Sequence, residues 1–413
     1  MQISDADARR LRRMEWPYGS LPDKELEGSG WRPEPFSQFV LKVHSRCNLS
    51  CTYCYVNHQV DQSWRSQPAA MSHRTVAATA GRVAQHARRH ALTAVHVVLH
   101  GGEPLLAGAD LLDHVVTAFR DAAPAETRVV FSLQTNAVLL TERMLDLCLG
   151  HGIRVGVSVD GGVDHHNRRR VRRDGSESLA DTHAGLARLT AQRFRDIFGG
   201  LLCVIDLASD PVEVYESLLA WDPPAVDFLL PHGNWLVRPP GRGADERDTP
   251  YADWLESLFD RWYSASEHET ELRLFDEIIA LLLGGRSRVE TVGLTPSTVV
   301  VVETDGSIEQ VDALKSAYQG AESTGLHVDR DDFDAALRHP GIVARQIGAA
   351  GLGEECAGCP IHRVCGGGYY PHRYRPGTGF RNRSVYCPDP FHLISHIGIR
   401  IGADLERARR RTG

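Results

Sequence analysis

The sequence predicts an α/β fold built on a parallel sheet, and three observations support this prediction. Short apolar runs of strand length alternate with longer stretches of helical periodicity. Every recognisable chemical motif comes directly after one of these apolar runs. Repeated right-handed βα units bring the carboxyl ends of the strands to one edge of the sheet, where α/β barrels and open parallel sheets carry their active sites. The motif positions and the predicted fold therefore agree.

The elements of this fold follow one another in a regular order. Residues 1–35 are rich in proline and glycine and lack a sustained period, so we expect a surface lead-in. Six strands then alternate with helical stretches such as residues 73–90. The expected strands cover residues 36–45, 94–100, 128–135, 154–160, 201–206 and 225–231.

The chain of 413 residues is longer than the roughly 250–300 residues over which a single core usually extends. We therefore expect a catalytic core over 36–235, followed by further regions. A Pro/Gly-rich linker and bridging helices fill 236–290, and a C-terminal helix spans 391–413. Between them, region 291–390 opens with a predicted hairpin whose turn is Asp305-Gly306.

Composition excludes several classes of protein. The net charge of −7 argues against a nucleic-acid partner, which would demand a basic face. No apolar run approaches the roughly 20 residues of a membrane helix, and the first residues lack the apolar core of a secretory signal. We expect a cytoplasmic protein without a membrane partner. All but three of the 46 basic residues are Arg, which we interpret as genome composition; the lysines are Lys24, Lys42 and Lys315.

The first cysteine cluster follows the first predicted strand. Cys47, Cys51 and Cys54 are spaced Cys-x3-Cys-x2-Cys, and thiolates are the usual ligands of iron-sulfur clusters. Three thiolates leave one iron of a four-iron cluster open to chelate a small molecule through its amine and carboxylate groups. A zinc knuckle is the alternative, but zinc favours four ligands and no fourth one lies nearby.

A second cluster lies near the C-terminus of the chain. Cys356, Cys359, Cys365 and Cys387 can saturate a second four-iron cluster, and a structural zinc ion is the alternative. The other two of the nine cysteines, Cys148 and Cys203, stand in apolar surroundings and are expected to be core thiols.

The first cluster and the GGEP turn at Gly101, Gly102, Glu103 and Pro104 together resemble the radical SAM superfamily, whose members cleave S-adenosylmethionine (SAM). The resemblance implies a partial (β/α)6 TIM-like barrel in which Cys47, Cys51 and Cys54 hold a [4Fe–4S] cluster and the GGEP motif binds the amino group of SAM. The other SAM-lining positions that it implies are Tyr53, Ser132, Asn136, Ser158 and Asp160, with Arg170 or Arg168 for the SAM carboxylate. Capping or surface roles are the alternative for the residues after the GGEP motif.

The second cluster is similar to the SPASM type of C-terminal extension, which implies an auxiliary iron-sulfur domain over 291–390. The sequence departs from that pattern, because Val311 and Tyr369 stand where ligands of a first auxiliary cluster are usual, and no cysteine precedes the hairpin. We therefore expect one auxiliary [4Fe–4S] cluster. Asp312, beside Val311, is a candidate proton acceptor by the same resemblance; an ordinary surface aspartate is the alternative. No chemistry is assigned to the histidines.

At a finer level, the stretches KVHSRCNLSCTYCYV, DQSWR, HGGEPLL and HRYRPGTGFRNRSVYC resemble the FxsB branch of these enzymes. The resemblance implies a peptide maturase that abstracts a β-hydrogen from a ribosomally made precursor peptide and joins that carbon to an aromatic ring. It also implies an external electron donor of the flavodoxin or ferredoxin type. The alternatives are formylglycine formation, thioether or ether crosslinking, epimerisation, and a non-catalytic iron-sulfur or zinc scaffold.

Overall fold

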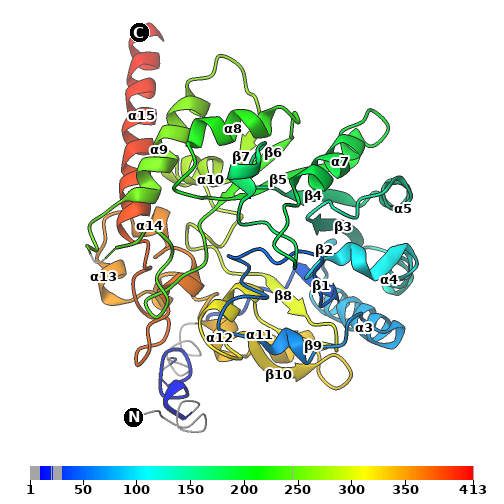
Figure 1. Cartoon of the computed structure of the whole chain (residues 1–413). Coiled ribbons are helices and arrows are strands. Elements are labelled where there is room, and N and C mark those ends of the chain that lie inside the picture. The colour runs from blue at the N-terminus through cyan, green and yellow to red at the C-terminus, as the bar shows by residue number, and fades with distance from the viewer. Residues whose placement is uncertain (1–9, 20, 22–29, 244, 413) are drawn as a thin grey trace.

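The computed structural model describes residues 10–19, 21, 30–243 and 245–412. Ten strands within this part of the chain form one sheet, in the order β10-β9-β8-β1-β2-β3-β4-β5-β6-β7 (Figure 1). They are β1 (Gln38–His44), β2 (Ala94–Gly101), β3 (Arg128–Thr135), β4 (Arg154–Ser158), β5 (Phe198–Val204), β6 (Ala225–Leu229), β7 (Glu271–Leu272), β8 (Val299–Val302), β9 (Ser307–Glu309) and β10 (Ser323–His327). The predicted α/β class is confirmed.

Strands β1 to β6 are parallel neighbours in chain order, as a partial TIM-like barrel requires. The six predicted strands are confirmed, with one shift at β5. This strand begins at Phe198 rather than at residue 201, because Phe198 and Gly200 already pair with β4. Alternate residues along the strands are fully buried, which is the period-2 pattern of a sheet covered on one face.

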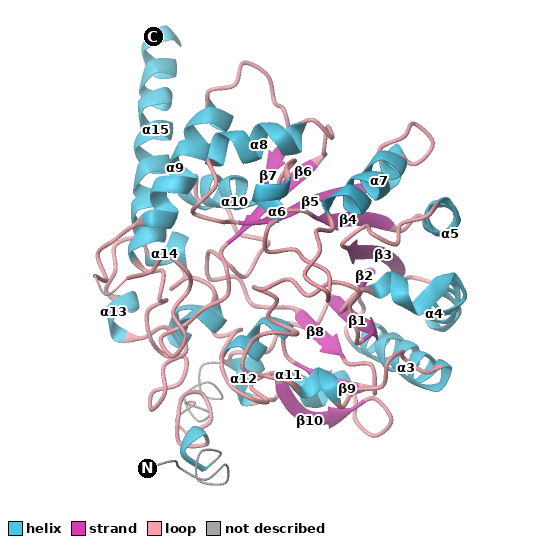
Figure 2. Ribbon diagram, in the orientation of Figure 1, coloured by secondary structure: helices cyan, strands magenta, loops and turns pink. Residues whose placement is uncertain are grey.

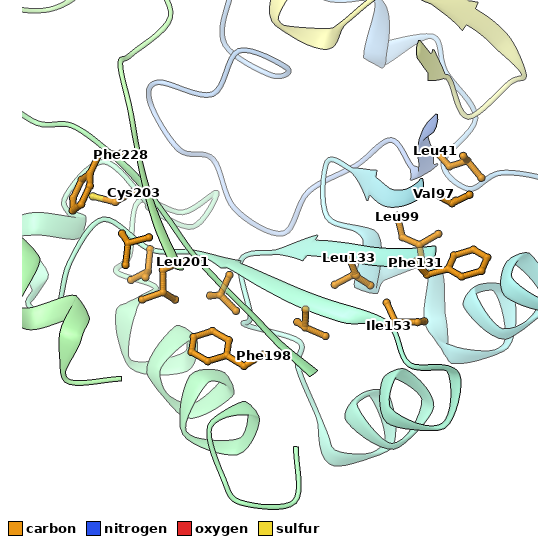
Figure 3. Packing of buried hydrophobic residues seen from close by; sticks show 14 of the residues in the cluster. Leu41, Val97, Leu99, Phe131, Leu133, Ile153, Phe198, Leu201, Cys203 and Phe228 are labelled. Atoms are coloured by element: carbon orange, nitrogen blue, oxygen red, sulfur yellow. The ribbon is translucent and has the colours of Figure 1, made fainter. Parts of the chain in front are cut away.

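The covered face of the sheet packs against helices (Figure 2). In Figure 3, apolar side chains such as Leu99, Leu133 and Phe198 fill the layer between the strands and these helices. The helices are α3 (His73–Arg89), α4 (Gly108–Ala122), α5 (Glu142–His151), α6 (Asp164–Asn167), α7 (Leu179–Leu189) and α8 (Pro211–Leu219). Their starts are fixed locally: Ser72 caps α3 and Thr141 caps α5 by accepting backbone N–H bonds, each worth about 1 kcal/mol.

The predicted hairpin is present as β8 and β9, and Gly306 takes a φ of +102° at its turn. Its place in the fold was not expected, since β8 pairs in parallel with β1 and so extends the barrel sheet. This pairing carries the short helix η4 (Asp312–Ser316) to the side of β1. The hairpin thereby brings acidic residues of the C-terminal half to the barrel.

Helices dominate the C-terminal part of the chain. The bridging helices predicted within residues 236–290 are two helices separated by β7, and the predicted C-terminal helix begins three residues early as α15, which lies beside α9 (Figure 1). The longer helices are α9 (Pro250–Tyr263), α10 (Arg273–Leu282) and α15 (Pro388–Thr412). The short ones are η1 (Ser63–Arg65), η2 (Pro104–Ala107), η3 (Arg195–Ile197), α11 (Phe333–Leu337), α12 (Pro340–Val343), η5 (Gly348–Gly351), α13 (Glu354–Ala357), α14 (His362–Cys365) and η6 (Tyr370–Arg373). Among the described helices, none combines the length and the apolar character that crossing a membrane requires.

Candidate active site

A cavity opens at the carboxyl ends of the barrel strands. The thiols of Cys47, Cys51 and Cys54 line it, and none of them is in a disulfide. Burial, followed by the charge of Glu103, raises the pKa of Cys47 to about 12. A cation must therefore replace the proton before this thiol becomes a ligand. Three such sulfurs on one wall, with open space beside them, fit a four-iron cluster with one free coordination site.

The two glycines of the GGEP turn face the loop that carries these cysteines. The Gly102 N–H donates to the carbonyl of His44 (2.9 Å), and the Glu103 N–H donates to that of Arg46 (3.0 Å). A Cβ atom on Gly101 would lie 2.2 Å from the His44 oxygen, and one on Gly102 would lie 2.5 Å from the Arg46 oxygen. Both glycines also line the cavity. The close passage of the cysteine loop therefore requires glycine here, in addition to the ligand approach that the sequence suggested.

Glu103 ties two strand ends together. Its buried carboxylate accepts hydrogen bonds from the N–H of Leu105 (3.0 Å), the hydroxyl of Thr135 (2.7 Å) and the N–H of Asn136 (2.9 Å). Burial raises the pKa of Glu103, and these three donors oppose that shift. Because Glu103 lines the cavity, it presents a fixed acceptor for an ammonium group. Pro104 begins η2 and is not among the residues that line the cavity.

Tyr53, Asp160 and Arg170 form a buried chain of hydrogen bonds. The Tyr53 hydroxyl donates to Asp160 Oδ2 (2.7 Å), and Arg170 Nη1 donates to the Tyr53 oxygen (2.7 Å). Tyr53 and Arg170 line the cavity, whereas Asp160 does not; its carboxylate also accepts the N–H of Val204 (3.1 Å). Arg170 can therefore meet a carboxylate in the cavity. The other candidate, Arg168, is paired with Asp206 at 2.6 Å.

Of the other predicted polar residues, Ser132 on β3, Asn136 just after it and Ser158 on β4, two reach the cavity. Asn136 and Ser158 line it, and Ser158 accepts a hydrogen bond from Gln134 (2.9 Å). Ser132 does not line it, contrary to the prediction, and its hydroxyl is bonded to His96 Nε2 (2.8 Å). Side chains on one face of a strand repeat every two residues, so Gln134, one step nearer the strand end, occupies the wall instead.

The rest of the wall is largely apolar and was not predicted. Tyr55 and His232 meet there with ring centroids 4.7 Å apart, and both line the cavity. Burial lowers the pKa of His232 to about 4, so this ring is neutral at neutral pH. The neighbouring lining residues are Val56, Leu202, Val204, Leu229, Leu230 and Pro231. The sequence signals that could have found them are two: Tyr55 and Val56 directly follow the first cysteine cluster, and the others stand on or just after the ends of β5 and β6.

A buried group of charges stands beside the cavity. Lys42 Nζ lies 2.6 Å from Asp312 Oδ2, while Lys315 Nζ lies 2.7 Å from Glu303 Oε1 and 3.3 Å from Glu309 Oε2. Burial alone would raise the pKa of Asp312, but Lys42 and Lys315 outweigh it and lower the pKa to about 2. Asp312 is therefore an anion, not the exposed aspartate of the alternative interpretation.

The sequence resemblance predicted that Asp312 faces the substrate as a proton acceptor. In the structure Asp312 is not among the cavity-lining residues, whereas His100 is, with its Nδ1 4.0 Å from Asp312 Oδ2. His100 had been assigned no chemistry. Its position directly before the GGEP motif was the available signal.

A second cavity contains the other cysteine cluster. Cys356 in α13, Cys359 between α13 and α14, Cys365 at the end of α14 and Cys387 just before α15 all line it, and all four are free of disulfides. Four sulfurs around one cavity fit a fully coordinated four-iron cluster, and they fit a structural zinc ion as well. Of the departures from the SPASM pattern, Val311 is buried and Tyr369 packs edge-on against His372 (5.3 Å).

Comparison with known proteins agrees with this geometry. Residues 41–215 match the model of the radical SAM superfamily. The cofactors that this match supports are SAM and a [4Fe–4S] cluster, and the three cysteines of the first cavity lie within the matched segment.

Relatives cover most of the chain at low identity. A cysteine-type anaerobic sulfatase-maturating enzyme of Clostridium perfringens is 25% identical over 86% of this chain and 94% of its own length. A serine-type enzyme of Bacteroides thetaiotaomicron is 21% identical over 88% of this chain and 90% of its own length. The structure of native anSMEcpe with bound AdoMet and Cp18Cys peptide has a TM-score of 0.73 at 21% identity, covering 89% of this chain and 99% of the other. Streptococcus suis SuiB bound to precursor peptide SuiA has a TM-score of 0.55 at 13% identity, covering 88% and 78%.

Proposed function

We propose that this chain is a radical SAM enzyme that oxidises a side chain of a ribosomally made peptide, joining a β-carbon to an aromatic ring of the same peptide. The observation that carries the proposal is the pair of separate cysteine-lined cavities. Three sulfurs line the first and four line the second, so one cluster keeps an open iron and the other is saturated.

The residues of the first cavity have different binding roles in this proposal. The three cysteines hold the cluster, Glu103 receives the ammonium group of SAM, and Arg170 receives its carboxylate. When bound together, the cluster and SAM supply a carbon radical that abstracts a hydrogen atom from an unactivated carbon. Tyr55 and His232 give part of the wall an aromatic and apolar character that suits an aromatic substrate side chain.

The second cavity supplies an electron acceptor in this proposal. Forming a carbon–carbon bond to an aromatic ring releases one proton and one electron after the hydrogen abstraction. Cys356, Cys359, Cys365 and Cys387 would hold a cluster that would supply the acceptor for that electron, and a carrier of the flavodoxin or ferredoxin class would serve as the external electron donor.

Formylglycine formation on a sulfatase is the second candidate, because sulfatase-maturating enzymes align over most of this chain. Val311 and Tyr369 weigh against it, since they replace the usual ligands of a first auxiliary cluster. The same replacement leaves thioether or ether crosslinking and epimerisation as further chemistries for the same cavity.

The test is mass spectrometry of the short peptide encoded beside this gene, co-expressed with the chain. The control is a variant carrying Cys47→Ala, Cys51→Ala and Cys54→Ala. We expect the loss of two hydrogens per site only with the intact cysteines, and fragmentation blocked between an aromatic residue and a near neighbour. An aldehyde at a Cys or Ser of a co-expressed sulfatase would favour the second candidate, and SAM that stays intact under reduction would contradict both.

A further inference from the structure

His100 is placed on the cavity wall by its strand. His100 is the last residue of β2 whose side chain points into the barrel. It lines the cavity, with 24% of its side chain exposed. Its Nδ1 is buried and has no hydrogen-bond partner, so the solvent-accessible part of the ring belongs to the side that carries Nε2. His96, four residues earlier on the same face, is bonded to Ser132 and does not reach the cavity.

The anion Asp312 and the cation Lys42 lie beside His100. Lys42 pairs with His100 in the register of β1 and β2, so the two side chains leave neighbouring strands on the same face. Asp312 Oδ2 lies 2.6 Å from Lys42 Nζ and 4.0 Å from His100 Nδ1. The second oxygen, Oδ1, is buried without a hydrogen-bond partner. A small rotation of the imidazole or of the carboxylate would bring Nδ1–H into hydrogen-bond distance of Asp312.

We propose that His100 is the residue that accepts the proton from the oxidised peptide, with Asp312 and Lys42 as the positioning residues that orient it. This inference rests on the proposed function and names a catalytic residue for it. The arrangement follows the general rule that a base at a reacting atom is itself oriented by a third group. Asp312 fixes the imidazole with its proton on Nδ1, leaving Nε2 as the acceptor toward the cavity.

The step balances as follows for a carbon–carbon crosslink. After the β-carbon has bonded to the ring, the ring carbon still carries its hydrogen. Its C–H bond breaks, one electron of that bond and the unpaired ring electron restore aromaticity, and the proton moves to His100 Nε2. The remaining electron leaves to an oxidised iron-sulfur cluster, and Asp312 stabilises the imidazolium.

The charge state of His100 suits this role. Burial, helped by Lys42 and opposed by Asp312, lowers the pKa of His100 to about 4, so the ring is a neutral acceptor at neutral pH. A weak base suffices when the electron leaves with or before the proton, because the resulting ring cation is strongly acidic and becomes aromatic on losing the proton. Asp312 is the poorer candidate, since Lys42 already occupies one of its oxygens and the carboxylate does not line the cavity.

The kinetic test separates hydrogen abstraction from proton removal. The holoenzyme, His100→Ala and the matched control His96→Ala are given the peptide deuterated at the β-carbon. For His100→Ala we expect deuterium still to enter 5'-deoxyadenosine within about 3-fold of the parent rate, while crosslinked peptide falls by about 100-fold. Added imidazole should restore at least about 10-fold of that loss, and His96→Ala should behave as the parent.

A second readout does not depend on turnover. Nitrogen-15 NMR of labelled histidines in the holoenzyme reports which ring nitrogen of His100 carries the proton. We expect Nδ1–H in the parent and a shift toward Nε2–H in Asp312→Asn, because the orienting anion is gone. Proton residence on Nε2 in the parent, or a His100→Ala variant that crosslinks as well as His96→Ala, would overturn the proposal.

Failure of the proposed function gives a different pattern. In that case the parent enzyme consumes SAM without crosslinking the peptide, while the NMR result still decides whether Asp312 orients His100. Loss of deuterium transfer in His100→Ala would also overturn the proposal, because it would place His100 in SAM binding or abstraction rather than in proton removal.

Discussion

The two cysteine-lined cavities differ in what accompanies the sulfurs. In the first, three thiols share the wall with Glu103, Arg170 and His100. In the second, four thiols share the wall with Glu355 and Arg383, and they come from α13, α14 and the residues that precede α14 and α15. Both sets therefore have charged neighbours, and the sets differ in the number of thiols, three against four. The difference teaches that the number of thiols, rather than the presence of charged neighbours, distinguishes the two cavities.

The largest effect is expected when a cysteine of the first cavity is substituted. Cys51→Ala should abolish formation of 5'-deoxyadenosine from SAM under reduction, because the open-iron cluster no longer assembles. Iron analysis should fall from about eight to about four per chain. The control Cys148→Ala removes a buried core thiol outside both cavities and should keep both the iron and the activity. Equal losses in the two variants would contradict the assignment.

Substituting a cysteine of the second cavity should slow peptide oxidation without stopping SAM cleavage. Cys365→Ala should lose about four irons per chain while 5'-deoxyadenosine is still formed, and peptide oxidation should fall by at least about 10-fold. Metal analysis of the parent decides the nature of this site at the same time. One zinc per chain with about four irons would replace the auxiliary cluster by a structural zinc ion.

A smaller effect is expected when a side chain is added at Gly102, against the loop that carries the first three cysteines. Gly102→Ala places a Cβ atom 2.5 Å from the backbone of Arg46, so the cysteine loop must move. We expect about 10- to 100-fold slower SAM cleavage, since a displacement of about 1 Å near reacting groups has effects of that size. Gly81→Ala on α3 has open space around it and should stabilise the fold by about 0.5–1 kcal/mol, without any change in rate.

An effect on stability rather than on activity is expected at the buried charges around Lys315. Burial raises the pKa of Glu322 to about 7, although Lys315 opposes the shift. A raised carboxyl pKa favours the folded state below the ordinary value of 4.5, and this advantage is lost as the pH rises toward 7. Glu322→Gln should therefore match the parent in unfolding free energy at pH 4.5 and exceed it by on the order of 3 kcal/mol at pH 8.

Urea unfolding of parent and variant at several pH values measures this gain. A matched substitution is Glu354→Gln, which replaces an exposed carboxyl group of the same kind. Its unfolding free energy should stay within about 0.5 kcal/mol of the parent at every pH. A gain at pH 8 that is equal in the two variants would contradict the role of burial.

Much of the fold was predictable because the signals are local. Alternating apolar residues found β1 to β6 within a few residues, and Asp305-Gly306 found the hairpin. The pairing of β8 with β1 joins residues about 260 positions apart, and no local pattern encodes that neighbour. The boundaries proposed for the separate domains remain predictions.

The site was predictable where spacing carries the chemistry. Both cysteine sets were found in this way, and each set lines a single cavity. Ser132 was misplaced by one step along β3, because the sequence does not show how deep in the barrel an inward residue lies. His100 was missed for a related reason, since its environment depends on η4, which reaches β1 only through the hairpin.

The burial of lysine in this arginine-rich chain has a practical consequence. Of its three lysines, Lys24 lies outside the described residues, and the side chains of Lys42 and Lys315 are 1% and 0% exposed. An amine-acylating reagent should therefore leave both untouched in the native protein and modify them only when the hairpin separates from β1. Peptide mapping after brief acylation would therefore show when the hairpin separates from β1, because Lys42 and Lys315 are acylated only after that separation.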